Sequence, residues 1–159
     1  MSEAYERTRE AALRILDRRR RTRAELERKL KEKGFEGPDI AAVCDRLEEV
    51  KILDDLEYAR LYLEGRRARP RGTRLLLQEL RGKGVPEATA RRALEELEAH
   101  GERGTAERER AVALARQSAR KVAGLPPREA RNKLFQALAR RGFDLDTIEA
   151  AVREVLPGR

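Results

Sequence analysis

The feature that most constrains this chain is a short pattern that occurs three times, each time around a glycine. In each copy two leucines stand four residues apart, a glycine follows four residues after the second, and an apolar residue comes next. Leucines at that spacing share one face of a helix. A glycine there ends the helix, because glycine adopts a left-handed backbone conformation without steric cost. The glycines are Gly34, Gly84 and Gly142, so the sequence predicts a repeat with a period of 50 to 58 residues.

Helices are predicted on both sides of each helix–glycine pattern. After the glycine, apolar residues recur at spacings of three to five, and an earlier stretch of helical periodicity precedes the leucines. The shared positions around the glycine are Leu26, Leu30, Phe35, Ile40, Val43 and Leu47 in the first copy, Leu76, Leu80, Val85, Ala90, Ala93 and Leu97 in the second, and Leu134, Leu138, Phe143, Ile148, Ala151 and Val155 in the third. The earlier stretches carry Ala12, Leu13 and Leu16, then Ala59, Tyr62 and Leu63, then Val112, Ala115 and Ala119.

Residues that start helices stand at the expected places. Side chains of Ser, Thr and Asp accept hydrogen bonds from the free N–H groups of a helix's first turn. Proline fits that turn because it has no N–H to leave unpaired. The candidates are Thr22 with Glu25 as a capping box, Asp54 with Asp55 and Glu57, Thr105, Asp144 or Asp146, and the prolines Pro38 and Pro86.

These helices predict an all-α chain made of three tandem copies of a three-helix unit, with about nine helices in total. No stretch alternates polar and apolar residues in the way of a strand. The expected units span residues 1–53, 54–101 and 102–159, with short joins between them. Units that contact only their neighbours form a quasi-linear array. We therefore expect an elongated and curved molecule, with some hinge freedom at the second join, which contains two glycines.

The composition limits what such an array can bury. Charged residues make up 42% of the 159 residues and aromatic residues 4%, and the mean hydropathy is −0.78. A chain this polar cannot fill one large core, whereas thin stacks of amphipathic helices need fewer apolar residues. Such a composition is also typical of disorder. The helical spacing of Leu, Ala, Val and Ile along most of the chain argues against disorder.

The charge is basic and unevenly distributed. Lys and Arg number 37 against 29 Asp and Glu, which gives a net charge of +8. Residues 18–33, 60–83 and 116–141 carry nine, eight and eight basic residues against three, two and one acidic ones, whereas the third helix of each copy is acidic. Such patches favour an anionic partner. A GC-rich or heat-adapted genome that favours Arg and Glu throughout explains the same Arg excess, so both explanations stay open.

The densest basic segment follows the first helix of the middle copy. Five arginines within nine residues repel one another unless an anion meets them. We expect these to be the central partner contacts: Arg66, Arg67, Arg69, Arg71 and Arg74. The flanking candidates are Arg18, Arg19, Arg20 and Arg21 in the first copy and Arg140 and Arg141 in the third. Tyr58 and Tyr62 are candidate aromatic contacts, with core packing as the alternative role of at least one.

Sequence patterns of catalysis and metal binding are missing. The chain has one cysteine, Cys44, on an apolar helical face, and one histidine, His100, near a helix end. A Cys/His metal site cannot be assembled from them, and no Gly-rich phosphate loop or Ser/His/Asp set occurs. Acidic pairs such as Asp54 and Asp55 are interpreted as helix caps rather than metal ligands. We therefore expect a non-enzymatic protein with no catalytic residue, no metal and no cofactor.

The same features bear on where the protein acts. A single cysteine rules out an internal disulfide framework, which favours a reducing compartment. No apolar run reaches the roughly 20 residues that cross a bilayer, and the N-terminus lacks the apolar segment of a signal peptide. We expect a soluble cytoplasmic protein without a membrane partner.

One segment of the middle copy resembles the most characteristic motif of RecX regulatory proteins. It runs Leu53-Asp54-Asp55-Leu56-Glu57-Tyr58-Ala59-Arg60 and continues through Arg66-Arg67 and Arg71-Gly72 to Lys83-Gly84-Val85. Residues 21–35 are similar to the family's N-terminal repeat and residues 133–143 to its C-terminal repeat, so the resemblance spans nearly the whole chain. Thr73 departs from the pattern, since a proline often opens that helix in the family. The departure puts only the start of the helix in doubt.

The resemblance implies a function. RecX proteins are built of tandem three-helix repeats, bind the RecA filament on single-stranded DNA, and usually suppress strand exchange and ATP hydrolysis. A protein of this kind is expected to be a monomeric regulator in DNA repair, recombination and SOS control, with RecA and single-stranded DNA as partners. The resemblance leaves open whether it inhibits or stimulates RecA, and whether it caps filament ends or coats the groove.

Two other classes of function fit the residues. A sequence-neutral binder of single-stranded nucleic acid that acts without RecA would show tight binding to bare strands with a steep salt dependence. A helical scaffold for another acidic protein would bind neither nucleic acid nor RecA.

Overall fold

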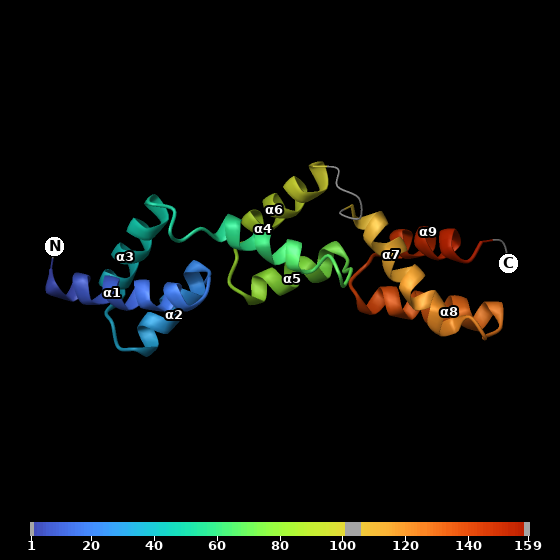
Figure 1. The fold of residues 1–159 in the computed structure, drawn as a ribbon, viewed down its shortest axis with the longest axis horizontal. Helices are drawn as coiled ribbons and strands as arrows, with labels where there is room; N and C mark the ends of the chain where they lie inside the picture. Colours follow the sequence, from blue (N-terminus) through green and yellow to red (C-terminus); the bar gives the residue numbers. More distant parts are fainter. Residues whose placement is uncertain (1, 101–105, 158–159) are drawn as a thin grey trace. The chain divides into compact units, whose positions relative to one another are not determined.

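The computed structural model describes residues 2–100 and 106–157, and over these ranges it contains nine α-helices, one 3-10 helix and no strand (Figure 1). The first repeat holds α1 (Glu3–Arg18), α2 (Arg23–Glu32) and α3 (Gly37–Glu49), and the second holds α4 (Asp55–Gly65), α5 (Thr73–Gly82) and α6 (Glu87–Ala99). The third holds α7 (Glu107–Ala119), the 3-10 helix η1 (Arg120–Val122), α8 (Pro127–Arg140) and α9 (Leu145–Val155). The predicted all-α repeat fold is confirmed.

The repeated glycines end the second helix of each repeat, as predicted. Gly34, Gly84 and Gly142 have φ angles of +91°, +91° and +84°. After Gly34, the N–H of Phe35 donates to the carbonyl of Leu30 at 3.2 Å, and the equivalent bond recurs after the other two glycines. This bond satisfies a carbonyl that the helix end leaves free and turns the chain towards the third helix.

Side chains cap the helices mostly where the sequence predicts. Thr22 accepts from the N–H of Glu25 at 3.1 Å, Asp54 from Glu57 at 3.1 Å and Asp144 from Thr147 at 2.8 Å. The bond from Thr147 lowers the pKa of the Asp144 carboxyl. Pro38 lies in the first turn of α3, whereas Pro86 lies directly before α6. The predicted cap Thr105 lies outside the described residues.

The chain forms two compact units, and the boundary between them passes through the middle repeat. The first unit contains the chain up to Leu61 together with Leu80–Ala93. Its core lies between α1, α2 and α3, with Leu26, Leu30 and Cys44 fully buried. Burial raises the pKa of the Cys44 thiol to about 11, so this cysteine is a packing residue.

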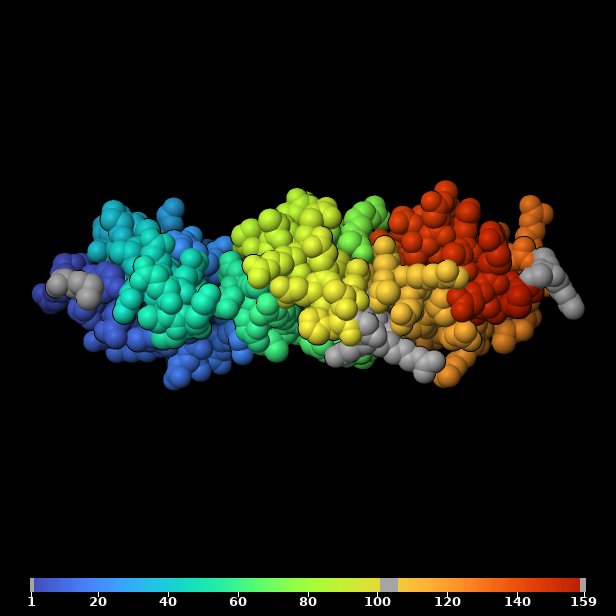
Figure 2. Space-filling view, turned by 90° about the horizontal axis from the view of Figure 1, so that it is seen from above, coloured from blue at the N-terminus to red at the C-terminus, as the bar shows by residue number. Residues whose placement is uncertain are grey.

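The second unit contains Tyr62–Glu79 together with the chain from Leu94 onwards. Its core gathers apolar side chains of α7, η1, α8 and α9, including the fully buried Leu134 and Leu138. The space-filling view shows the side chains of α7 (yellow-orange) packed directly against those of α9 (red) (Figure 2).

Candidate partner-binding surfaces

One glutamate organises part of the central arginine cluster. Glu79 on α5 lies 2.6 Å from Arg71 Nε through Oε1 and 3.5 Å from Arg66 Nε through Oε2. The hydroxyl of Tyr62 donates to the same carboxylate, and the Arg66 guanidinium lies 4.7 Å from the centre of the Tyr62 ring. Burial and the bond to Glu79 raise the pKa of Tyr62, while the hydrogen bond with Tyr62 raises the pKa of Arg66. Arg66 and Arg71 are therefore both engaged by side chains of the same molecule, Arg71 by Glu79 and Arg66 by Glu79 and Tyr62.

The other arginines of the cluster point outward. Arg67 forms an exposed ion pair with Glu64 at 3.4 Å. Arg69 and Arg74 are exposed and, within residues 2–100 and 106–157, form no ion pair. Arg71 Nη1 donates to the carbonyl of Arg69 at 2.8 Å, which fixes the loop that carries Arg69. Of the five predicted central contacts, Arg69 and Arg74 are therefore the exposed arginines without an ion pair among the described residues.

Both candidate tyrosines use their hydroxyl groups within the molecule. Tyr62 donates to Glu79, and Tyr58 donates to Glu25 Oε1 at 3.4 Å. Both side chains are half-buried. These contacts give each tyrosine a role within the fold. Base stacking by either tyrosine stays a prediction.

The flanking arginines of the first repeat lie where α1 ends. Arg18 is the last residue of α1, and Arg19 continues in an extended conformation. Arg18, Arg19 and Arg20 are exposed. Arg21 is different, because its side chain is only 16% exposed and its Nη1 lies 3.3 Å from Glu25 Oε2.

The structure brings the flanking arginines of the third repeat to the central loop. The N–H of Gly72, next to Arg71, donates to the carbonyl of Arg141 at 2.8 Å. Arg140 is exposed and Arg141 half-buried at the end of α8. Within the second unit, the loop of residues 69–74 and the end of α8 are therefore neighbours.

A buried arginine that sequence reasoning missed fixes this arrangement. Arg110 on α7 is 6% exposed. Its guanidinium donates to the carbonyl of Arg71 at 2.8 Å, to Thr73 Oγ1 at 3.1 Å and to Glu98 Oε1 at 3.1 Å. The sequence holds no signal for it, because Arg110 stands in a Glu/Arg-rich stretch that is typical of a solvated helix face.

The start of the second helix docks on the next repeat in the same way at both joints. In the first unit, Thr22 Oγ1 donates to the carbonyl of Lys83 at 2.6 Å, and the N–H of Arg23 donates to Asp55 Oδ1 at 2.9 Å. In the second unit, Gly72 takes the place of Thr22, and the N–H of Thr73 donates to Glu107 Oε1 at 3.2 Å. A carboxylate of the following repeat thus supplies a cap to the preceding one.

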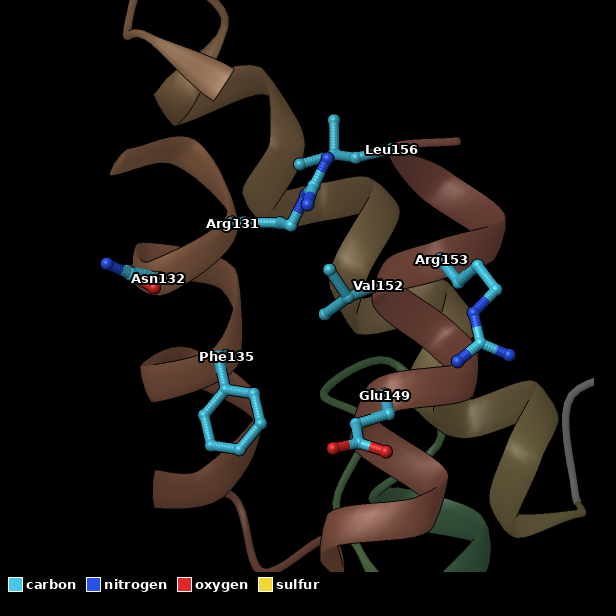
Figure 3. Close-up of a pocket in the computed structure, with 7 residues that line it drawn as sticks. All are labelled: Arg131, Asn132, Phe135, Glu149, Val152, Arg153 and Leu156. Carbon is cyan, nitrogen blue, oxygen red and sulfur yellow. The ribbon is translucent and has the colours of Figure 1, made fainter. Parts of the chain in front are cut away.

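A pocket of about 510 Å³ lies between α8 and α9 in the third repeat (Figure 3). Figure 3 shows the ring of Phe135 and the carboxylate of Glu149 facing each other across it, with Val152 and Leu156 further along the pocket, towards the C-terminal end of α9. Arg131 and Arg153 complete the rim. A pocket with an apolar floor and a charged rim can accept one apolar side chain of a partner.

The described residues hold neither a metal site nor a membrane-spanning helix. In that part of the chain, no group of three or more His, Cys, Asp or Glu side chains is arranged to hold a metal ion. None of the helices there is long and apolar enough to cross a membrane.

The chain matches known proteins along most of its length. Profiles of the first, second and third three-helix domains of RecX match residues 9–47, 54–94 and 106–152. The regulatory protein RecX of Mycolicibacterium vanbaalenii is 40% identical over 159 aligned residues, which cover 92% of this chain and 84% of the relative. That of Thermobifida fusca is 37% identical and covers 96% and 80%. The crystal structure of RecX from Lactobacillus salivarius has a TM-score of 0.84 at 25% identity and 98% coverage of both chains.

Proposed function

Because the chain belongs to the RecX family of regulatory proteins, we propose that it regulates the RecA recombinase without catalysing a reaction itself. It binds the RecA filament on single-stranded DNA and inhibits ATP hydrolysis and strand exchange. Through that inhibition it acts in DNA repair, recombination and SOS control. It acts in the cytoplasm, where such filaments form, and as a monomer.

One observation carries this proposal: each repeat has exposed arginines that no carboxylate neutralises among the described residues. They are Arg18, Arg19 and Arg20 in the first repeat, Arg69 and Arg74 in the second, and Arg140 in the third. A filament repeats the same anionic surfaces along its length, so several weak contacts act together. Multivalent binding of this kind favours a filament over a single RecA subunit.

The first test measures ATP hydrolysis by RecA of the same organism on single-stranded DNA. The protein is titrated at ratios too low to coat the DNA, and its binding to the bare strand is measured in parallel. Suppression at these ratios is the expected result. Unchanged hydrolysis together with tight binding to the bare strand would replace this proposal with the direct nucleic-acid binder.

A charge-reversal pair locates the contact. Arg69→Glu combined with Arg74→Glu should abolish suppression, because both side chains are exposed and unpaired in the described structure. The matched control is Arg46→Glu combined with Arg91→Glu, which changes the net charge equally on the acidic third helices. Equal loss in both double variants would assign the effect to net charge alone and reject these contacts.

A further inference from the structure

A basic pocket lies between α1 and α2 of the first repeat. It has a volume of about 550 Å³. Ala11 and Ile15 of α1 supply its apolar lining. Five cationic side chains and one acidic one complete it: Arg14, Arg18, Arg21, Lys29, Lys33 and Glu32.

Four of the five cations of this pocket lack an ion-pair partner within the described molecule. Arg14, Arg18, Lys29 and Lys33 form no ion pair there. Glu32 lies 3.9 Å from Arg28, which does not line the pocket. Arg21 has its Nη1 on Glu25, but its Nε is buried without a hydrogen-bond partner. The four unpaired cations around one pocket therefore favour the entry of an anion.

The middle repeat shows what the same positions look like when they are neutralised internally. Arg21 and Arg71 stand thirteen residues before the repeat glycine, and Lys29 and Glu79 stand five residues before it. In the middle repeat Arg71 Nε lies 2.6 Å from Glu79. In the first repeat a lysine stands in that place and Arg21 pairs instead with Glu25, at 3.3 Å, so the lysine adds a positive charge to the pocket that no carboxylate offsets. Like charges in one pocket are unfavourable unless an external anion joins them.

We propose that this α1–α2 pocket binds the phosphate groups of a single nucleic-acid strand, with Arg14, Arg18, Arg21, Lys29 and Lys33 as their ligands. Guanidinium groups bind phosphate oxygens through two parallel hydrogen bonds, and lysines add mobile positive charge. Exposed Arg19 and Arg20 stand in the chain between two pocket residues. Arg18 to Arg21 thus form four consecutive cationic residues. Such a row matches the nucleic-acid backbone, which has a charge on every nucleotide, better than it matches the scattered carboxylates of an acidic peptide.

This inference deepens the proposed function and rests on it, because it names the part of the chain that would contact the strand inside the filament. It is tested without RecA. The whole protein is titrated into a fluorescein-labelled oligothymidylate, and fluorescence anisotropy is followed over a range of salt concentrations.

The informative variant is Lys29→Glu, which places a carboxylate at the position that Glu79 holds in the middle repeat. The new carboxylate should pair with Arg21, so the fold is retained while the pocket loses its affinity for anions. We expect strand affinity to fall about tenfold or more and the slope of log K against log salt to shrink by about one to two. Lys31→Glu is the matched control, since Lys31 lies on the same helix, is exposed and does not line the pocket. Far-UV circular dichroism confirms that both variants are folded.

Each outcome decides the inference. A loss with Lys29→Glu that is much greater than with Lys31→Glu supports it. Equal losses, or a wild-type protein that does not bind the oligonucleotide at low salt, would overturn it. Retained strand binding with lost suppression of RecA would assign the pocket to an acidic protein surface and also overturn it. If the strand data agree but the wild-type protein leaves RecA unaffected, the pocket stands and the proposed function falls.

Discussion

At the scale of single residues, the nearest carboxylate decides what each arginine does. Arg69 and Arg71 are two residues apart in the same loop, yet Arg71 is held by Glu79 and Arg69 is exposed. The sequence could not separate them, because Glu79 lies eight residues further on, beyond the helical spacing that relates neighbouring side chains. Density of arginine therefore predicts a basic segment but not which of its members are exposed and unpaired, and partner binding by the segment stays a prediction.

Glycine substitutions test the repeated helix ends. All three repeat glycines have positive φ, so alanine should cost about 1–2 kcal/mol of unfolding free energy at each. At Gly84 a Cβ would lie 2.5 Å from Cβ of Ala24, and at Gly142 it would lie 2.8 Å from the backbone nitrogen of Leu75. Gly34 has nothing within 4 Å. We expect Gly84→Ala and Gly142→Ala to cost about 1–3 kcal/mol more than Gly34→Ala in urea unfolding.

The second-site change Ala24→Gly is the control for that explanation. It removes the atom that the new Cβ would meet, so it should restore part of the stability in the Gly84→Ala background and none in the Gly142→Ala background. Equal losses of unfolding free energy at all three glycines would mean that backbone strain alone determines the cost. The atoms that the new Cβ meets at Gly84 and Gly142 would then move aside without cost.

At the scale of helices, sequence patterns within a single helix predicted its position and most of its caps, whereas contacts between repeats could not be predicted. Leucine spacing and the repeat glycines predicted which segments are helical, and Asp54 and Asp144 cap helices as expected, because these features depend on residues within one turn. Glu25 was predicted as half of a capping box, but its carboxylate receives Arg21 and Tyr58 instead. Partners such as Asp55 for Arg23 are 32 residues apart, and no periodicity encodes them.

The joint around Arg110 gives a prediction at this scale. Arg110→Met should lower the unfolding free energy by about 2–3 kcal/mol, because it leaves Glu98 and the carbonyl of Arg71 without their donor. The expected loss of unfolding free energy is smaller than for a fully buried ion pair, because the Glu98 side chain is 34% exposed. Urea unfolding followed by far-UV circular dichroism measures the loss.

Arg108→Met serves as the comparison on the same helix. The Arg108 side chain is 71% exposed and lies 3.9 Å from Glu154, so its replacement should change stability by no more than about 0.5 kcal/mol. Similar values for the two variants would show that Arg110 contributes no more than a surface charge.

At the scale of the whole molecule, the apolar residues form separate cores rather than one. Within the described residues, the cluster of the first repeat and that of the third share no side chain. The composition anticipates this division, since a chain with 42% charged residues cannot fill one large interior. Chains built of repeats accordingly open locally, in contiguous groups of helices.

Hydrogen exchange tests that division. Leu30 and Leu138 are equivalent residues, four before the repeat glycine, and both are fully buried. Leucine-to-alanine changes in cores cost about 2–5 kcal/mol. Leu138→Ala should therefore accelerate amide exchange about tenfold or more in α7, α8 and α9 and leave α1, α2 and α3 at wild-type rates, and Leu30→Ala should do the reverse. Mass spectrometry of peptic fragments after native-state labelling reads both patterns, and equal acceleration in all six helices by either variant would show that the two cores unfold as one.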